Sequence, residues 1–152
     1  MGAKRAKKRT KRSGIVYFAI NNRLEGMVKI GMTIDTANAR LNFANKRNEF
    51  MPGFWEINQK VKSKDAKQTE KLAHELFAEQ HDVESISEEM YFIPDGMIVK
   101  NMADHVREKM TLHQKQVKKE IQLQDKLASV QEELEKLREA NKQKLLNDSD
   151  NP

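Results

Sequence analysis

The sequence predicts an α+β fold, in which a small domain with a three-stranded antiparallel sheet flanked by helices precedes a long C-terminal helix. Apolar residues alternate with a period of two near the start of the domain and recur at helical spacing further on. A charged segment without glycine or proline then carries apolar residues in heptads. We therefore divide the chain into a disordered basic arm (1–13), a globular domain (14–98), a long helix with a coiled-coil segment (99–146) and a disordered tail (147–152).

The positive charge of the chain is concentrated in the arm. The 152 residues include 28 Lys and Arg against 23 Asp and Glu, and seven of the cations lie in the first twelve positions, which leaves 21 cations against 23 acids elsewhere. These cations are Lys4, Arg5, Lys7, Lys8, Arg9, Lys11 and Arg12. Such a segment cannot bury enough apolar surface to fold, but it binds polyanions by releasing counterions. We expect the arm to bind nucleic acid; the alternative is a solubilising tail.

Composition excludes several classes of protein. The chain has no Cys, which excludes a disulfide framework, a thiolate nucleophile and a zinc finger. The only early apolar run, residues 15–20, is too short to cross a membrane. We expect a soluble protein of the cytoplasm without a membrane partner.

Two strands joined by a short connection open the domain. The first covers residues 15–20 and the second covers Met27–Thr33, with Tyr17 on the face opposite Phe18. The segment between them, residues 21–26, has the Asn and Gly content of a hairpin connection. We therefore expect the two strands to pair antiparallel.

Each helix of the domain should begin at a capping residue. Asp35 is the expected N-cap of the first helix, which ends before the Met-Pro-Gly segment at 51–53. Asp65 and Gln68 resemble a capping box, and the helix that they open runs to about Gln80.

Two further segments suit strands. Residues 55–61 form the third strand, and residues 90–93 form either a final strand or an extended plug before the turn at 94–96. The order of elements is therefore β-β-α-β-α, with the last strand left open.

The C-terminal helix contains a heptad seam. Its positions are spaced 4, 3, 4, 3 and 4, and the last is an Asn, which at a core a site tends to specify a dimer and its register. The seam consists of Leu123, Leu127, Val130, Leu134, Leu137 and Asn141. An upstream frame from Val106 to Val117 does not join it, which implies a stutter near residues 120–123. We expect a homodimer; the alternative is a charged helix that never pairs.

Four short motifs follow one another in the domain. They are Gly14-Ile15-Val16-Tyr17, Val28-Lys29-Ile30-Gly31-Met32-Thr33, Arg40-Leu41 and Glu70-Lys71-Leu72-Ala73-His74. Together, in this order and spacing, they resemble the GIY-YIG nuclease superfamily, in particular its phage and bacterial DNA-binding (Orf172-like) branch. The resemblance spans about 80 residues, and it implies a GIY-YIG-like domain in a phage-encoded protein of the host cytoplasm.

The resemblance also implies an endonuclease that hydrolyses phosphodiester bonds of double-stranded DNA with one Mg²⁺ or Mn²⁺ ion. Glu70 would bind the metal, and Arg40 would hold the phosphate through two oxygens. Tyr17 would polarise or deprotonate the attacking water. Lys29 would either lower the pKa of Tyr17 or bind phosphate. His74, on the same helical face as Glu70, would shuttle a proton or orient the carboxylate.

Two departures from the superfamily pattern leave other functions open. The second half-motif has Lys29 in place of a tyrosine, and the asparagine expected after the metal-binding helix is not evident. The segment Glu89-Met90-Tyr91-Phe92 stands there and resembles the acid-plus-aromatic ending of the phage branch. The alternatives are a DNA-binding module that has lost catalysis and a structural protein in which the coiled coil is the functional part.

Deleting residues 1–12 should weaken nucleic-acid binding without unfolding the rest of the chain, because the arm buries nothing. Each phosphate contact contributes about 0.9 to the slope of log K against log salt on duplex DNA. The slope should therefore fall by about 0.9 for each contact that the arm makes. Salt titrations of the full and truncated chains measure this. An unchanged affinity and slope would show that the arm makes no phosphate contacts.

Overall fold

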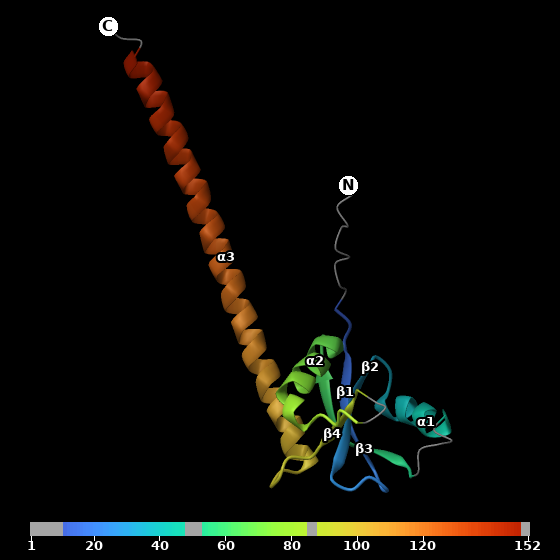
Figure 1. Cartoon of the computed structure of the whole chain (residues 1–152). Helices are drawn as coiled ribbons and strands as arrows, with labels where there is room; N and C mark the ends of the chain where they lie inside the picture. The colour runs from blue at the N-terminus through green and yellow to red at the C-terminus, as the bar shows by residue number, and fades with distance from the viewer. Residues whose placement is uncertain (1–10, 48–52, 85–87, 150–152) are drawn as a thin grey trace. The chain divides into compact units, whose positions relative to one another are not determined.

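The structure is a computed structural model that describes residues 11–47, 53–84 and 88–149. Figure 1 shows its helices and strands. In chain order they are β1 (Gly14–Asn21), β2 (Met27–Thr33), α1 (Ala37–Arg47), β3 (Trp55–Ser63), α2 (Ala66–Leu76), the 3₁₀ helix η1 (Ala78–Gln80), β4 (Met90–Phe92) and α3 (Val99–Ser149). This is the predicted α+β fold. The predicted arm up to residue 10 and the last three residues of the tail lie outside the described residues.

The sheet has four strands in the order β3-β1-β2-β4, and each neighbouring pair is antiparallel. The predicted hairpin is confirmed, with Tyr17 of β1 opposite Gly31 of β2. The segment for which the sequence left a strand and a plug open is a strand, because Met90–Phe92 pairs with Met27–Lys29. The prediction of a three-stranded sheet is therefore one strand short.

Both faces of the sheet are covered. On one face, Phe18 and Ile30 pack with apolar side chains of α2 and of the first turns of α3. On the other face, Tyr17 and Ala19 pack with Leu41 of α1. Figure 1 shows α1 and α2 on opposite sides of the sheet. A strand buried on both faces needs apolar residues at odd and even positions, which explains the unbroken apolar run of β1.

Strand β3 contains a β-bulge. Its register against β1 shifts by one residue at Asn58. In a regular strand, residues 55, 57 and 61 would share one face. Because of the bulge, Trp55 and Ile57 pack on the α1 side of the sheet, whereas Val61 packs on the α2 side. The bulge therefore decides which side chains of β3 share a face with Tyr17.

The cap predicted for α2 is confirmed, and the cap predicted for α1 is wrong by one residue. Asp65 Oδ1 accepts a hydrogen bond of 3.1 Å from the Gln68 backbone N–H. In α1 the capping residue is Thr36, whose Oγ1 accepts a hydrogen bond of 3.2 Å from the backbone N–H three residues on. Asp35 belongs to the preceding turn, since its backbone N–H donates to Thr33 Oγ1 at 3.1 Å.

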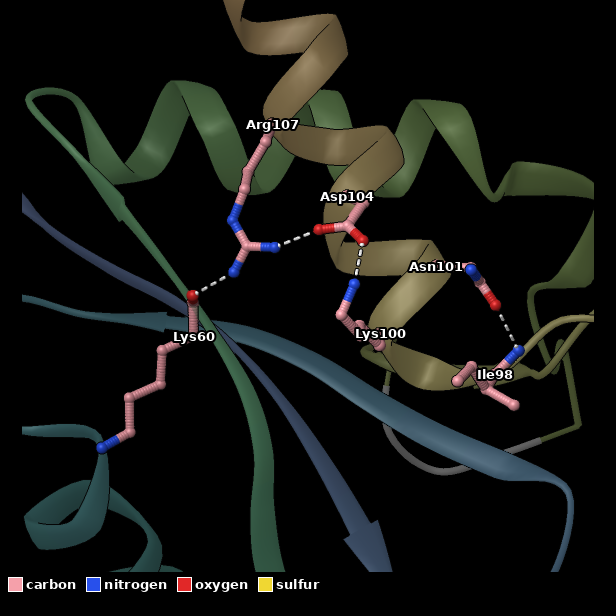
Figure 2. A network of polar contacts seen from close by, with 6 residues as sticks. All are labelled: Lys60, Ile98, Lys100, Asn101, Asp104 and Arg107. Carbon is pink, nitrogen blue, oxygen red and sulfur yellow. Dashed lines mark hydrogen bonds and ion pairs between the residues drawn. The ribbon is translucent and has the colours of Figure 1, made fainter.

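Polar contacts anchor the start of α3 on the domain, as Figure 2 shows. The Asn101 side chain accepts a hydrogen bond of 3.0 Å from the Ile98 N–H, which satisfies a donor just before the first turn. Arg107 donates to the Asp104 carboxylate and, at 2.9 Å, to the Lys60 carbonyl of β3. The bond to Lys60 ties the third turn of α3 to the edge strand β3, and the other two order the start of the helix.

The first turns of α3 belong to the globular domain. Val99, Met102 and Val106 are buried in the core between α3 and the sheet. The first compact unit of the chain accordingly reaches Met110, and a second unit begins at Thr111. The upstream heptad frame thus contains residues that face the domain core, which is why it does not join the downstream frame.

From Thr111 onward, α3 forms the second unit of the chain. The apolar positions of the predicted seam are exposed there, since between 46% and 65% of the surface of each residue is accessible. They are Leu123, Leu127, Val130, Leu134 and Leu137. No helix in the described segments is both long and apolar enough to cross a membrane. A row of exposed leucines on a charged helix is typical of one strand of a coiled coil.

We expect two copies of this helix to pair in parallel through the seam. The heptad frame puts Leu127, Leu134 and Asn141 at a positions, so that Glu133 at g faces Arg138 at e of a second copy. Sedimentation equilibrium at tens of micromolar should give the mass of a dimer. Leu134→Lys should give a monomer, because it places a charge in the seam.

The variant Ala128→Lys is the matched control. Residue 128 lies at a b position outside the seam, so this variant should stay dimeric. Equal masses for the two lysine variants would show that pairing does not use the seam, and a monomeric wild-type chain would contradict the prediction altogether.

Candidate functional site

Side chains from three elements and one loop gather around the Tyr17 phenol, beside Gly31 of β2. Tyr17 lies in β1, Arg40 in α1 and Glu70 in α2, and Glu89 is the residue just before β4. All three charged side chains act electrostatically on the Tyr17 phenol. A Cβ atom at position 31 would lie 2.7 Å from Tyr17 Oη and 3.1 Å from a Glu89 carboxylate oxygen. Only glycine leaves room for the phenol at this place in the strand.

The Tyr17 hydroxyl lies at the centre of this cluster. The side chain is buried, with 2% of the residue exposed, and its oxygen accepts a hydrogen bond from Arg40. Burial raises the pKa of Tyr17, and the Glu89 carboxylate raises it further, while Arg40 acts in the opposite direction. The expectation that Lys29 lowers the pKa of this phenol is therefore not met. In the protein alone Tyr17 is a neutral phenol at pH 7.

The ammonium group of Lys29 is directed to Glu89 instead. Lys29 Nζ lies 3.2 Å from Glu89 Oε2 and 5.9 Å from the centre of the Trp55 ring. Lys29 shares a sheet face with Tyr17, as the sequence predicts, because its cross-strand partner is Ala19. Its charge is offset by the Glu89 carboxylate, which explains why Lys29 is not the cation that acts on the phenol.

Glu70 and His74, one turn apart on α2, bond to the edge of β2. The Glu70 carboxylate accepts a hydrogen bond from the Met32 backbone N–H. His74 Nε2 lies 3.1 Å from the Ile30 carbonyl oxygen, and since a carbonyl only accepts, Nε2 carries the proton. Burial raises the pKa of Glu70, His74 lowers it, and the charge of Glu89 adds to the rise.

A shallow hollow of 410 Å³ gives access to Glu70 and His74. Lys67 and Lys71 of the same helix also line it, so that cations border the carboxylate. A larger hollow of 550 Å³ lies between the β1–β2 turn and the start of α3, and contains none of the converging side chains. The site is therefore identified by the side chains that line it and not by the size of its hollow.

Sequence reasoning missed two members of the site, Glu89 and Tyr91. Glu89 binds Lys29 and borders Gly31, and its backbone carbonyl accepts from the N–H of the residue preceding Gly31 at 2.9 Å. The Tyr91 ring centre lies 5.3 Å from that of His74, and burial raises the pKa of Tyr91 to about 12. The acid-plus-aromatic segment that contains both residues was the available signal, but its pairing with β2 was not evident from the sequence.

The donor set fits an open site for a hard divalent cation. Among the described residues, no group of three His, Asp or Glu side chains is placed to hold a metal ion. Glu70 and Glu89 are near enough to raise the pKa of Glu70 by their mutual repulsion. Mg²⁺ is commonly held by one or two carboxylates, with water and substrate phosphate completing its shell. These residues therefore suit Mg²⁺ or Mn²⁺ bound together with a phosphate, but they do not form a closed structural site.

Comparison with known protein families finds a match over most of the chain. The T5orf172 domain family matches residues 14–144, a range that contains every side chain of the site described above. Comparisons with curated proteins and with solved structures found no match to this chain.

The raised pKa of Glu70 predicts how stability depends on pH in metal-free buffer. The folded state holds the Glu70 proton more tightly than the unfolded state does, so the carboxyl lowers stability as the pH rises above its ordinary pKa of 4.5. Glu70→Gln keeps an acceptor for the Met32 N–H and removes the charge. The two proteins should melt at similar temperatures below that pKa, and the variant should melt higher at neutral pH.

The control variant is Glu79→Gln, which changes an exposed carboxylate in η1. Thermal unfolding followed by circular dichroism measures all three proteins. A difference between Glu70→Gln and wild type that is the same at every pH would contradict the prediction, because it would not come from the titration of Glu70.

Proposed function

The chain belongs to the T5orf172 domain family, and from this premise we propose that it is a DNA-acting protein, a divalent-metal-dependent endonuclease that hydrolyses phosphodiester bonds. The family occurs in phage and bacterial proteins and is related to the GIY-YIG nuclease fold. The observation that carries the proposal is that Arg40 of α1 and Glu70 of α2 both act on the buried phenol of Tyr17 in β1, so that three separate elements bring opposite charges to one hydroxyl.

Arg40 is the residue that would bind the scissile phosphate. Its guanidinium has five N–H donors in a planar fork, and the Tyr17 hydroxyl accepts from the group. The remaining donors suit two oxygens of a phosphate, whose charge grows in the transition state. A phosphate bound here would lie beside the Tyr17 hydroxyl, since the phenol itself occupies the space at Gly31.

Glu70 is the residue that would hold one Mg²⁺ or Mn²⁺, with Glu89 beside it. When bound, such an ion supplies positive charge that stabilises the developing charge on phosphate. The repulsion between the two carboxylates favours a cation at this place. The bond of His74 Nε2 to the Ile30 carbonyl engages that nitrogen and supports the orienting role rather than a proton shuttle through Nε2.

The environment of Tyr17 favours one of its two expected roles. A buried phenol with a raised pKa keeps its proton at neutral pH, so it can polarise the attacking water by hydrogen bonding. Deprotonation of water by this group would require a lowered pKa. We therefore infer that Tyr17 orients and polarises the water while Arg40 fixes the hydroxyl.

A second function, DNA binding without cleavage, is favoured by two specific observations. The pKa of Tyr17 is raised rather than lowered, and the charge of Lys29 is offset by Glu89. The site would then bind phosphate without turning it over. A purely structural protein, in which the coiled coil alone functions, leaves the convergence of Arg40 and Glu70 without a role.

Replacing Glu70 tests the proposal most directly. Glu70→Ala should abolish cleavage of supercoiled DNA in Mg²⁺ or Mn²⁺, while binding in EDTA and the fold stay nearly intact, because alanine removes the cation ligand and favours the helix. Arg40→Ala should slow cleavage by about 100-fold or more and also weaken binding. Tyr17→Phe should slow cleavage without affecting binding, because only the hydroxyl is lost.

The exposed Glu79→Ala is the matched control and should cut like the wild type. If Glu70→Ala cuts at the wild-type rate in the same metal, the assignment of Glu70 is wrong. If the wild type binds DNA but never cuts it, the non-catalytic function replaces the nuclease.

A further inference from the structure

Two lysines of β3 lie on the face of the sheet that contains the site. Past the bulge, Lys60 is the cross-strand partner of Tyr17, and Lys62 is the partner of Ile15. Partners in an antiparallel pair share a face, so both lysines point to the Tyr17 side of the sheet. Both are exposed. Figure 2 shows the Lys60 side chain directed away from Arg107 and α3.

The two β3 lysines and the carboxylates of the site lie on opposite sides of Tyr17, while Lys29 of β2 lies with the carboxylates and is paired with Glu89. The two lysines lie on edge strand β3, whereas Glu70 and Glu89 lie beside β2 at the opposite side of Tyr17. Neighbouring strands are about 4.8 Å apart, so β3 and β2 are about 10 Å apart. One strand of duplex DNA presents a phosphate every 3.4 Å or so along its axis. A DNA strand that crosses this face would therefore present successive phosphates to the β3 lysines and to the site.

The basic arm joins the domain at the same corner. Strand β1 begins at Gly14, which pairs with Ser63, the residue that follows Lys62. The Arg12 backbone carbonyl accepts a hydrogen bond of 3.1 Å from the Ala66 N–H at the start of α2. The described chain thus enters the domain beside the end of β3, so Arg12 lies close in the fold to the strand that carries the two lysines.

We propose that Lys60 and Lys62 form a track for the sugar-phosphate backbone of duplex DNA, which leads from the basic arm across β3 to Arg40 and the site. The inference rests on the proposed function, because it assigns the approach of the DNA to that same site. The bulge at Asn58 is a structural requirement, since without it these side chains would face α2 and α3 on the other side of the sheet.

A different role for the lysines is protection of a sheet edge. β3 is an edge strand, and charged side chains on edge strands prevent pairing with other chains. This role predicts no dependence of DNA affinity on the lysines, but it predicts self-association when they are lost. The two explanations therefore differ in two measurable quantities.

The test is the double variant Lys60→Gln/Lys62→Gln, bound to a short DNA duplex in EDTA over a series of salt concentrations. Two lost contacts should reduce the slope of log K against log salt by about 1.8, and should weaken binding about 30-fold at 0.15 M salt. The Arg107 bond to the Lys60 backbone is independent of the side chain, so the fold should be kept.

The matched control is Lys115→Gln/Lys118→Gln, which makes the same change of charge on exposed residues of the second unit. It should bind DNA with the wild-type slope. Lys60→Arg/Lys62→Arg keeps both charges, and it should also keep the wild-type slope.

Each other outcome has a separate meaning. A wild-type chain that does not bind DNA would overturn the proposed function and the track together. Normal wild-type binding with an unchanged slope in the double variant would overturn the track alone. Unchanged binding together with assemblies larger than the expected dimer in sedimentation would assign the lysines to edge protection. If the same titration with duplex RNA shows a loss that duplex DNA does not, the choice of DNA is overturned.

Discussion

Strand β2 pairs with β4 only along its first three residues, and beyond them side chains of α2 bond to its edge. The Ile30 carbonyl accepts from His74, and the Met32 N–H donates to Glu70. Buried backbone groups need such partners, so these two bonds fix how α2 lies against the sheet. The same bonds hold the Glu70 carboxylate half-buried within electrostatic reach of Tyr17. The need to provide hydrogen-bond partners for the backbone of β2 thus positions Glu70, the proposed metal ligand.

Burial and mutual repulsion of carboxylates make the charged forms of the site residues unfavourable in the free protein. Burial raises the pKa values of Tyr17, Glu70 and Tyr91, and the neighbouring carboxylates raise them further. Arg40 is the cation that acts against this trend at the Tyr17 phenol. Carboxylates that repel one another lower stability, and a bound cation would relieve the repulsion. Under the proposed function, bound metal and phosphate would recover the stability that these charges cost the free protein.

Much of the fold was predictable because it depends on residues close in sequence. Alternation fixed the two strands of the hairpin and put Tyr17 on the face opposite Phe18, and the Asp65 side chain caps the helix that it was expected to cap. Helical spacing put Glu70 and His74 on one face of α2. The N-cap of α1 was misplaced by one residue, because Thr33 binds the Asp35 N–H and makes that residue part of the turn.

The sequence by itself determined the order of the first five elements, the heptad spacing of the C-terminal helix and three residues of the site, Tyr17, Arg40 and Glu70. Only the tertiary structure decided that Met90–Phe92 is a fourth strand, that Glu89 rather than Tyr17 neighbours Lys29, and that the bulge at Asn58 turns Lys60 to the site. The physical reason is the distance in sequence between the residues that interact. Periodicity and capping are set by neighbours within one turn or one hairpin, whereas strand order, register shifts and the burial that changes a pKa are set by segments far apart in the chain.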